Sequence, residues 1–143
     1  MPLNILVVDD SATMRKMIIR TLNLSGLPVG EIHEAGNGKQ GLMMLAMHNI
    51  DLALVDINMP EMNGEEMIDR VKSNPNLKDL PVVVVSTEGS TTRIASLLAR
   101  NGVGYVHKPF TPEHLSHVVH EVTGGAYGSI VGEPPVQGGG PDF

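Results

Sequence analysis

Short apolar segments alternate with longer segments of helical period along most of this chain. The apolar segments are rich in β-branched residues, which favour strands, and they lie at Ile5–Val8, Glu31–Ala35, Leu52–Val55, Val82–Val85 and Val103–Val106. Strands that alternate with helices are typical of βα units, in which helices cover a parallel sheet. The pattern therefore predicts an α/β fold with five parallel strands.

Three of these segments have no polar position. They read ILVV at Ile5–Val8, LALV at Leu52–Val55 and VVVV at Val82–Val85. Strands of a parallel sheet that are covered on both faces show such continuous apolar runs. We therefore expect these three strands to be the innermost strands of the sheet.

Five helices are expected between and after the strands. In the first, residues at helical spacing would face the sheet, and Ser11 would cap the helix; these residues are Met14, Met17, Ile18, Thr21 and Leu22. The others are expected at Gly38–Met47, Gly64–Lys72, Thr91–Arg100 and from Pro112 onward, the last with Thr111 as its cap. The methionines, including Met43, Met44 and Met47, are expected to fill the core.

Composition limits the location and the partners of the protein. The 143 residues include no cysteine and no apolar run of membrane-spanning length, so we expect a cytoplasmic protein without membrane insertion. A net charge of −6 with 3% aromatic residues argues against nucleic-acid binding. Residues 124–143 are rich in Gly and Pro and too poor in apolar side chains to fold alone. We expect one domain over residues 1–123 and a flexible tail after it.

Ionisable and hydroxyl side chains follow the predicted strands where each strand ends. Asp9 and Asp10 follow the first strand, Asp56 the third and Ser86 the fourth, and Lys108 comes shortly after the fifth. Ligands of open parallel sheets bind outside the carboxyl ends of the strands. We therefore expect these five side chains to share one site.

Three carboxylates in one crevice repel one another by several kcal/mol at an effective dielectric constant of about 20. Lys108 supplies a single positive charge, which does not balance them. A site built from oxygen ligands suits Mg²⁺ better than Zn²⁺. With Mg²⁺ beside it, Asp56 is the natural nucleophile for a phosphoryl group, and Lys108 would neutralise the phosphoryl oxygens.

Four motifs in this order resemble one known family. They are VVDDS, DINMPEMNG, VVVVST and GYVHKPF, and they span the chain from Met1 to about Thr123. The chain resembles the receiver domains of two-component response regulators, and within them the stand-alone CheY-like chemotaxis regulators. The resemblance implies a doubly wound, flavodoxin-like sheet of order 2-1-3-4-5, with helices on both faces.

The resemblance also implies a role for each residue of the site. Asp56 would be phosphorylated, and Mg²⁺ would be bound by Asp9, Asp10, Asp56 and the backbone carbonyl of Asn58. The Lys108 side chain would contact the phosphoryl oxygens, and the peptide bond from Lys108 to Pro109 would be cis. Ser86 and Tyr105 would switch conformation with the phosphoryl group, and the pair Asn58 and Glu88 would set a short phosphorylated lifetime.

The function implied is a phosphorylation switch with no enzyme activity on outside substrates. A sensor histidine kinase would donate the phosphoryl group, and helix four, strand five and helix five would dock an effector such as the flagellar motor switch. A phosphatase is a further expected partner, and a monomer is expected.

Two other functions remain open, and a metal site in the last helix is disfavoured. A phosphorelay carrier would pass its phosphoryl group to a histidine phosphotransfer protein, and a phosphohydrolase would need an acid where Asn58 stands. The three histidines of the last helix, His114, His117 and His120, lie opposite its apolar stripe, so we interpret them as a solvated face and not as metal ligands.

Overall fold

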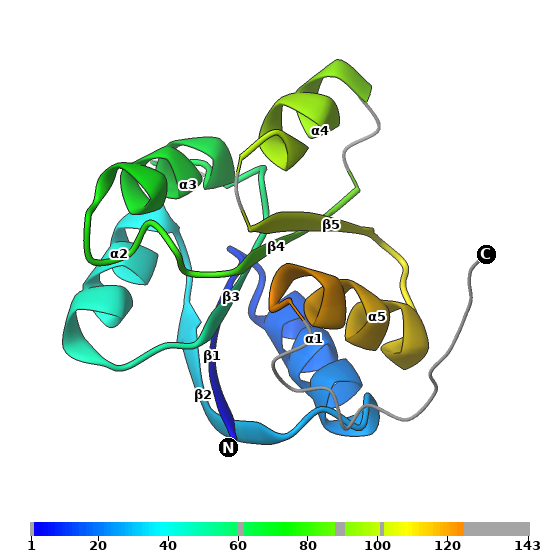
Figure 1. Cartoon of the computed structure of the whole chain (residues 1–143). Coiled ribbons are helices and arrows are strands. Elements are labelled where there is room, and N and C mark those ends of the chain that lie inside the picture. Colours follow the sequence, from blue (N-terminus) through cyan, green and yellow to red (C-terminus); the bar gives the residue numbers. More distant parts are fainter. Residues whose placement is uncertain (1, 60–61, 88–90, 101, 125–143) are drawn as a thin grey trace.

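The computed structural model describes residues 2–59, 62–87, 91–100 and 102–124, and Figure 1 shows its elements. Ten elements alternate along the chain: β1 (Leu3–Val8), α1 (Ala12–Leu24), β2 (Val29–Ala35), α2 (Gly38–Met47), β3 (Leu52–Val55), α3 (Gly64–Ser73), β4 (Val82–Ser86), α4 (Thr91–Leu98), β5 (Val103–His107) and α5 (Pro112–Val122). The strands form one parallel sheet of order β2-β1-β3-β4-β5. The predicted fold and strand order are confirmed.

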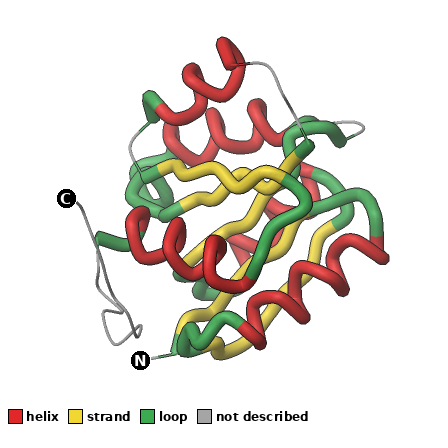
Figure 2. The backbone as a smooth tube through the Cα atoms, turned by 90° about the vertical axis from the view of Figure 1, so that its right-hand side faces the viewer, coloured by secondary structure: helices red, strands yellow, loops and turns green. Residues whose placement is uncertain are grey.

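Helices cover both faces of the sheet, as Figure 2 shows. On one face, side chains of α1 and α5, among them Ile18, Leu22 and Leu115, pack on the sheet. On the other face, side chains of α2, α3 and α4, such as Met67 and Leu97, form a second core. Every residue of β3 and β4 is buried, and so is β1 except for Asn4, which confirms the expected innermost strands.

Side-chain caps begin four of the helices. The Ser11 hydroxyl accepts a hydrogen bond from the Met14 N–H at 3.1 Å, and the Thr111 hydroxyl accepts one from the His114 N–H at 3.1 Å, as predicted. Asn37 and Asn63 cap α2 and α3 in the same way. The helix α4 ends at Leu98, two residues earlier than predicted.

The expectation that the methionines fill the core is wrong for three of them. Met17, Met43 and Met47 are 56%, 60% and 67% exposed. A helix buries only the centre of its apolar stripe, which in α1 is formed by Ile18 and Leu22. The methionines at the margins of the stripe therefore remain in contact with water.

The last helix does not gather its histidines into a metal site. His114 and His117 are exposed, and His120 is partly buried. Within the described ranges, the residues whose ligand atoms lie close enough to hold an ion are three aspartates at another place in the fold. No helix in the described part of the chain is long and apolar enough to cross a membrane.

Candidate functional site

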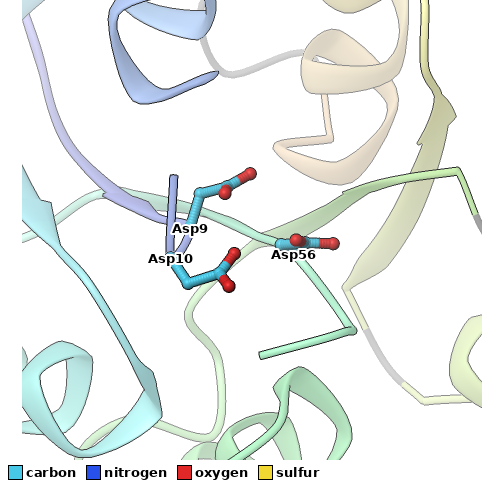
Figure 3. A group of neighbouring side chains, drawn as sticks. All are labelled: Asp9, Asp10 and Asp56. Carbon is cyan, nitrogen blue, oxygen red and sulfur yellow. The ribbon is translucent and has the colours of Figure 1, made fainter. Parts of the chain in front are cut away.

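Three carboxylates converge at the carboxyl ends of β1 and β3. Asp9 and Asp10 follow β1, and Asp56 follows β3, which is paired with β1 so that Val8 lies opposite Val55. One carboxylate oxygen from each aspartate lies within 4.8 Å of the other two, and Figure 3 shows how the three side chains gather. The strand ends bring them together because neighbouring parallel strands end at the same edge.

Backbone hydrogen bonds hold the acidic loops in place. The Asp9 N–H donates to the Ala35 carbonyl at 3.1 Å, and the Asp56 N–H donates to the Val8 carbonyl at 2.9 Å. The Ser11 N–H donates to Asp9 Oδ1 at 2.9 Å. The two backbone bonds continue the sheet pattern past the strand ends, and the bond from Ser11 orients the Asp9 carboxylate.

Arg15 is a site residue that the sequence analysis missed. Its guanidinium donates to the backbone carbonyl of Asp9 at 2.5 Å and forms an ion pair with Glu34 at 2.8 Å. Arg15 lies in the first turn of the helix that follows the two aspartates, and this proximity was the available signal. The side chain ties β2, α1 and the acidic loop together.

Gly64 is the second residue that the sequence analysis missed. Its N–H donates to the Ile57 carbonyl at 2.8 Å, so α3 begins against the loop that carries Asp56. A Cβ atom at this position would overlap the backbone of Asp56 and Ile57. Only glycine permits this close approach, and the start of α3 therefore packs directly against the backbone of Asp56.

Lys108 provides the positive charge of the site. Its Nζ atom lies 3.1 Å from Asp9 Oδ2 and 3.8 Å from Asp56 Oδ2, and the side chain is 12% exposed. The Lys108 N–H donates to the Ser86 carbonyl at 2.9 Å. The peptide bond from Lys108 to Pro109 is cis, as the resemblance implies.

The electrostatics of the site concentrate on Asp56. Burial raises the pKa of Asp56 above 3.8, Lys108 lowers it and Asp9 raises it again. Hydrogen bonds from the Asn58 backbone and the Ser86 side chain lower the pKa less than burial raises it. The folded protein therefore ionises Asp56 at a cost, and an added cation would relieve that cost.

The donor set fits a hard divalent cation. Asp9 and Asp56 are buried while Asp10 is exposed, so the cluster offers buried ligands and an entrance from solvent. All three ligands are carboxylate oxygens, and the chain contains no cysteine, which suits Mg²⁺ or Ca²⁺ better than a soft metal. With one lysine beside three carboxylates, the cluster keeps a negative charge.

Ser86 on β4 and Tyr105 on β5 lie beside the edge of the sheet that carries the three aspartates, which we call the acidic edge. Ser86 is fully buried at the end of β4, and its side chain bonds to Asp56. The Tyr105 hydroxyl donates to the Ser86 carbonyl at 3.3 Å, and the Tyr105 side chain is partly buried. Asn58 is exposed, and Glu88 lies outside the described residues.

The sheet order and the acidic edge define a doubly wound α/β protein with a candidate cation site at its switch point. Residues 5–120 match the family model of the response regulator receiver domain. The chain belongs to this family.

Named relatives point to chemotaxis proteins. The chain is 34% identical to the "Chemotaxis protein CheY homolog" of Campylobacter jejuni, over 92% of this chain and 100% of that protein. It is 35% identical to "Chemotaxis protein CheY1" of Helicobacter pylori, over 85% of this chain and 98% of that protein. The crystallised chemotaxis protein CheY4 of Vibrio cholerae superposes with a TM-score of 0.74 at 30% identity, over 85% and 99% of the two chains.

Proposed function

We propose that this protein is a phosphorylation-driven binding switch of a two-component system, with a role in chemotaxis and the control of the flagellar motor. The observation that carries the proposal is Asp56, a buried carboxylate between Lys108 and a cluster of acids at the carboxyl edge of the sheet. Relatives named as chemotaxis proteins support the cellular role. The kinase and the switch would meet in the cytoplasm.

A divalent cation, which we propose to be Mg²⁺, would be held by Asp9, Asp10, Asp56 and the backbone carbonyl of Asn58. When bound, it supplies positive charge that offsets the acidic cluster and the oxygens of an incoming phosphoryl group. Asp10 is the exposed member of the cluster, so it is the ligand that an ion from solvent would meet first. The Asp9 carboxylate accepts hydrogen bonds from the Ser11 N–H and the Lys108 ammonium, and these two bonds fix its orientation.

Asp56 would act as the nucleophile toward a phosphohistidine of a sensor histidine kinase. A carboxylate oxygen of Asp56 bonds to phosphorus, the bond from phosphorus to the imidazole nitrogen breaks, and its electron pair stays on the imidazole. Burial leaves the Asp56 carboxylate poorly solvated, which favours attack. Lys108 Nζ, at 3.8 Å from Asp56 Oδ2, is within reach of the phosphoryl oxygens. Water later hydrolyses the acyl phosphate, and Asn58 and Glu88 would set that rate.

Ser86 and Tyr105 would convert the phosphoryl group into a change of surface. The Ser86 side chain already bonds to Asp56, so it is placed to donate to a phosphoryl oxygen. Movement of Ser86 reaches Tyr105, because the Tyr105 hydroxyl bonds to the Ser86 carbonyl. The phosphoryl group would thereby shift the protein toward the conformation in which the face made by α4, β5 and α5 docks the effector. The protein is a phospho-acceptor and not an enzyme with outside substrates.

The test is a mass measurement after incubation with acetyl phosphate and Mg²⁺. We expect a gain of one phosphoryl group that is lost in Asp56→Ala and kept in Asp79→Ala, a matched control on the exposed loop before β4. No gain in the unaltered protein, or an equal gain in Asp56→Ala, would refute the proposal. A phosphorylated state that decays within minutes argues for a switch, whereas a lifetime of many hours would favour the phosphorelay carrier.

A further inference from the structure

A groove of about 710 Å³ runs between the end of α4, β5 and α5. Apolar side chains on its two sides, Leu98 from α4 and Val118 and Val122 from α5, line it together with Tyr105. Leu98 is 46% exposed. Between the two sides, β5 presents Gly104, where an added Cβ would meet Val118 and Val122. The groove therefore presents apolar side chains together with the charged residues Arg100 and Glu121, and no described residue covers it.

The chain itself leaves the folded domain at this groove. Gly124 lines the groove two residues after the end of α5, and its φ of +66° ends the helix in the left-handed conformation. Its N–H donates to the Glu121 carbonyl at 3.2 Å. Nineteen further residues, 125–143, follow from that point. The segment after Gly124 therefore begins at the rim of the groove.

The first apolar residues of that segment lie within reach of the whole groove. Tyr127, Ile130 and Val131 come three, six and seven residues after Gly124. At about 3.4 Å per extended residue they reach up to roughly 10 to 25 Å from Gly124. A short tether gives such residues an effective concentration in the millimolar range at the groove. An independent partner of equal affinity would need a higher concentration to displace them.

We propose that residues 126–131 of the same chain cover the groove, with Tyr127, Ile130 and Val131 packed against Leu98, Tyr105 and Val122. Burial of these apolar side chains on both sides supplies the driving force. The proposed contact involves six residues close to Gly124, which limits the conformational entropy that docking costs. The tail thus occupies the face that carries Tyr105.

Occupation of the groove is coupled to the acidic site through one residue. Tyr105 lines the groove and bonds to the Ser86 carbonyl, while the Ser86 side chain bonds to Asp56. An occupant that favours one position of Tyr105 must change the affinity of the site for its own ligand, and the reverse holds equally. Competition between the tail and an effector rests on the proposed function, but the docking of the tail does not.

The docking can be tested in the full-length chain without phosphodonor or Mg²⁺, so that its outcome is independent of the proposed function. Because the chain has no cysteine, Ser129→Cys accepts a single nitroxide label. Broadening of methyl resonances is then measured in leucine- and valine-labelled protein. Leu98 is the chosen reporter because it lies on α4, across the groove from Gly124. We expect its broadening to fall at least twofold when Tyr127, Ile130 and Val131 are all changed to Ser.

The control variant is Val136→Ser, an apolar change farther along the tail, which should leave the broadening of Leu98 unchanged. The tail changes should not unfold the domain, because the buried core residues in the described ranges lie between Leu3 and Val119. Equal broadening of Leu98 in the triple variant would overturn the proposal. So would broadening that appears between labelled and unlabelled chains in a mixture, because a second copy would then be the occupant.

Discussion

The two halves of the acidic edge are built differently. On the side of β1 and β3, backbone hydrogen bonds from Asp9 to Ala35 and from Asp56 to Val8 extend the sheet past its strand ends. On the side of β4 and β5, one carbonyl, that of Ser86, accepts both the Lys108 N–H and the Tyr105 hydroxyl. The half at β1 and β3 therefore holds charged side chains on a backbone that the sheet fixes. The half at β4 and β5 is connected through a single carbonyl, which can pass a change of conformation from one residue to another.

Lys108 is the point where the two halves meet. Its side chain contacts Asp9 and Asp56, and its backbone N–H bonds to Ser86. A change of charge among the carboxylates must therefore act on Ser86 at the end of β4, whose carbonyl also bonds to the Tyr105 hydroxyl. The difference between the halves predicts that some substitutions will change the charge balance of the carboxylates and that others will change only the link between Ser86 and Tyr105.

The largest effect is expected for Lys108→Met without divalent cations. Removing one partner of a buried ion pair costs about 3 kcal/mol, because the remaining charges lose their compensation. Chemical denaturation in a chelator should show this loss of unfolding free energy. The same variant should bind Mg²⁺ more tightly in calorimetry, because a competing positive charge is gone.

Lys39→Met, which removes an exposed charge on α2, is the matched control and should change neither quantity. Weaker binding of Mg²⁺ by Lys108→Met would show that the lysine organises the carboxylates more than it competes with the cation. The two halves would then be less separate than we describe them.

The next effect concerns the frame of the acidic half. Gly64→Ala places a methyl group against the Asp56 and Ile57 backbone and should lower the unfolding free energy by about 2 kcal/mol. Gly41→Ala is the comparison, since its Cβ meets the flexible end of Met67. Alanine gains about 1 kcal/mol of helix propensity there, so the net change should be small. Equal losses in the two variants would contradict a special role of the Gly64 contact.

The effect of pH comes third. Because the pKa of Asp56 is raised in the folded protein, the folded state binds this proton more tightly than the unfolded state. The contribution of Asp56 to the unfolding free energy is therefore lost as the pH rises from about 3.8 through the raised pKa. With a chelator present, Asp56→Asn should therefore be more stable than the unaltered protein near neutral pH.

The advantage of Asp56→Asn should vanish below pH 3.8, where both side chains are neutral. Denaturation curves across this range, with Mg²⁺ and without it, measure the effect. A larger advantage at low pH than at neutral pH would mean that Lys108, and not burial, dominates the pKa of Asp56.

The smallest effect is expected in the transmitting half. Tyr105→Phe removes one hydrogen bond to the Ser86 carbonyl and should cost about 0.5 kcal/mol, the low end for such bonds. Its affinity for Mg²⁺ should stay within about twofold, because no bond to a carboxylate is removed. Calorimetry checks this value. A large loss of Mg²⁺ affinity would mean that Tyr105 supports the acidic frame as well.

The pattern of strands and strand ends was enough to predict the core of the site. Asp9, Asp10 and Asp56 follow apolar strands, and parallel strands end at one edge, so their convergence follows from topology alone. The order of the strands required the family resemblance, because no local pattern specifies which strand lies beside which.

The tertiary structure decided which side chains find cover and which backbones come close. Helical period assigned Met17 and Ile18 to one stripe, but the docking of α1 buries Ile18 and leaves Met17 exposed. Arg15 on the Asp9 carbonyl, Gly64 against Asp56 and Tyr105 on the Ser86 carbonyl are contacts that no local period specifies, although the first two join neighbouring segments of the chain. Sequence determines the face on which a residue lies, because that depends on local period, whereas the partner it meets depends on how separate elements pack.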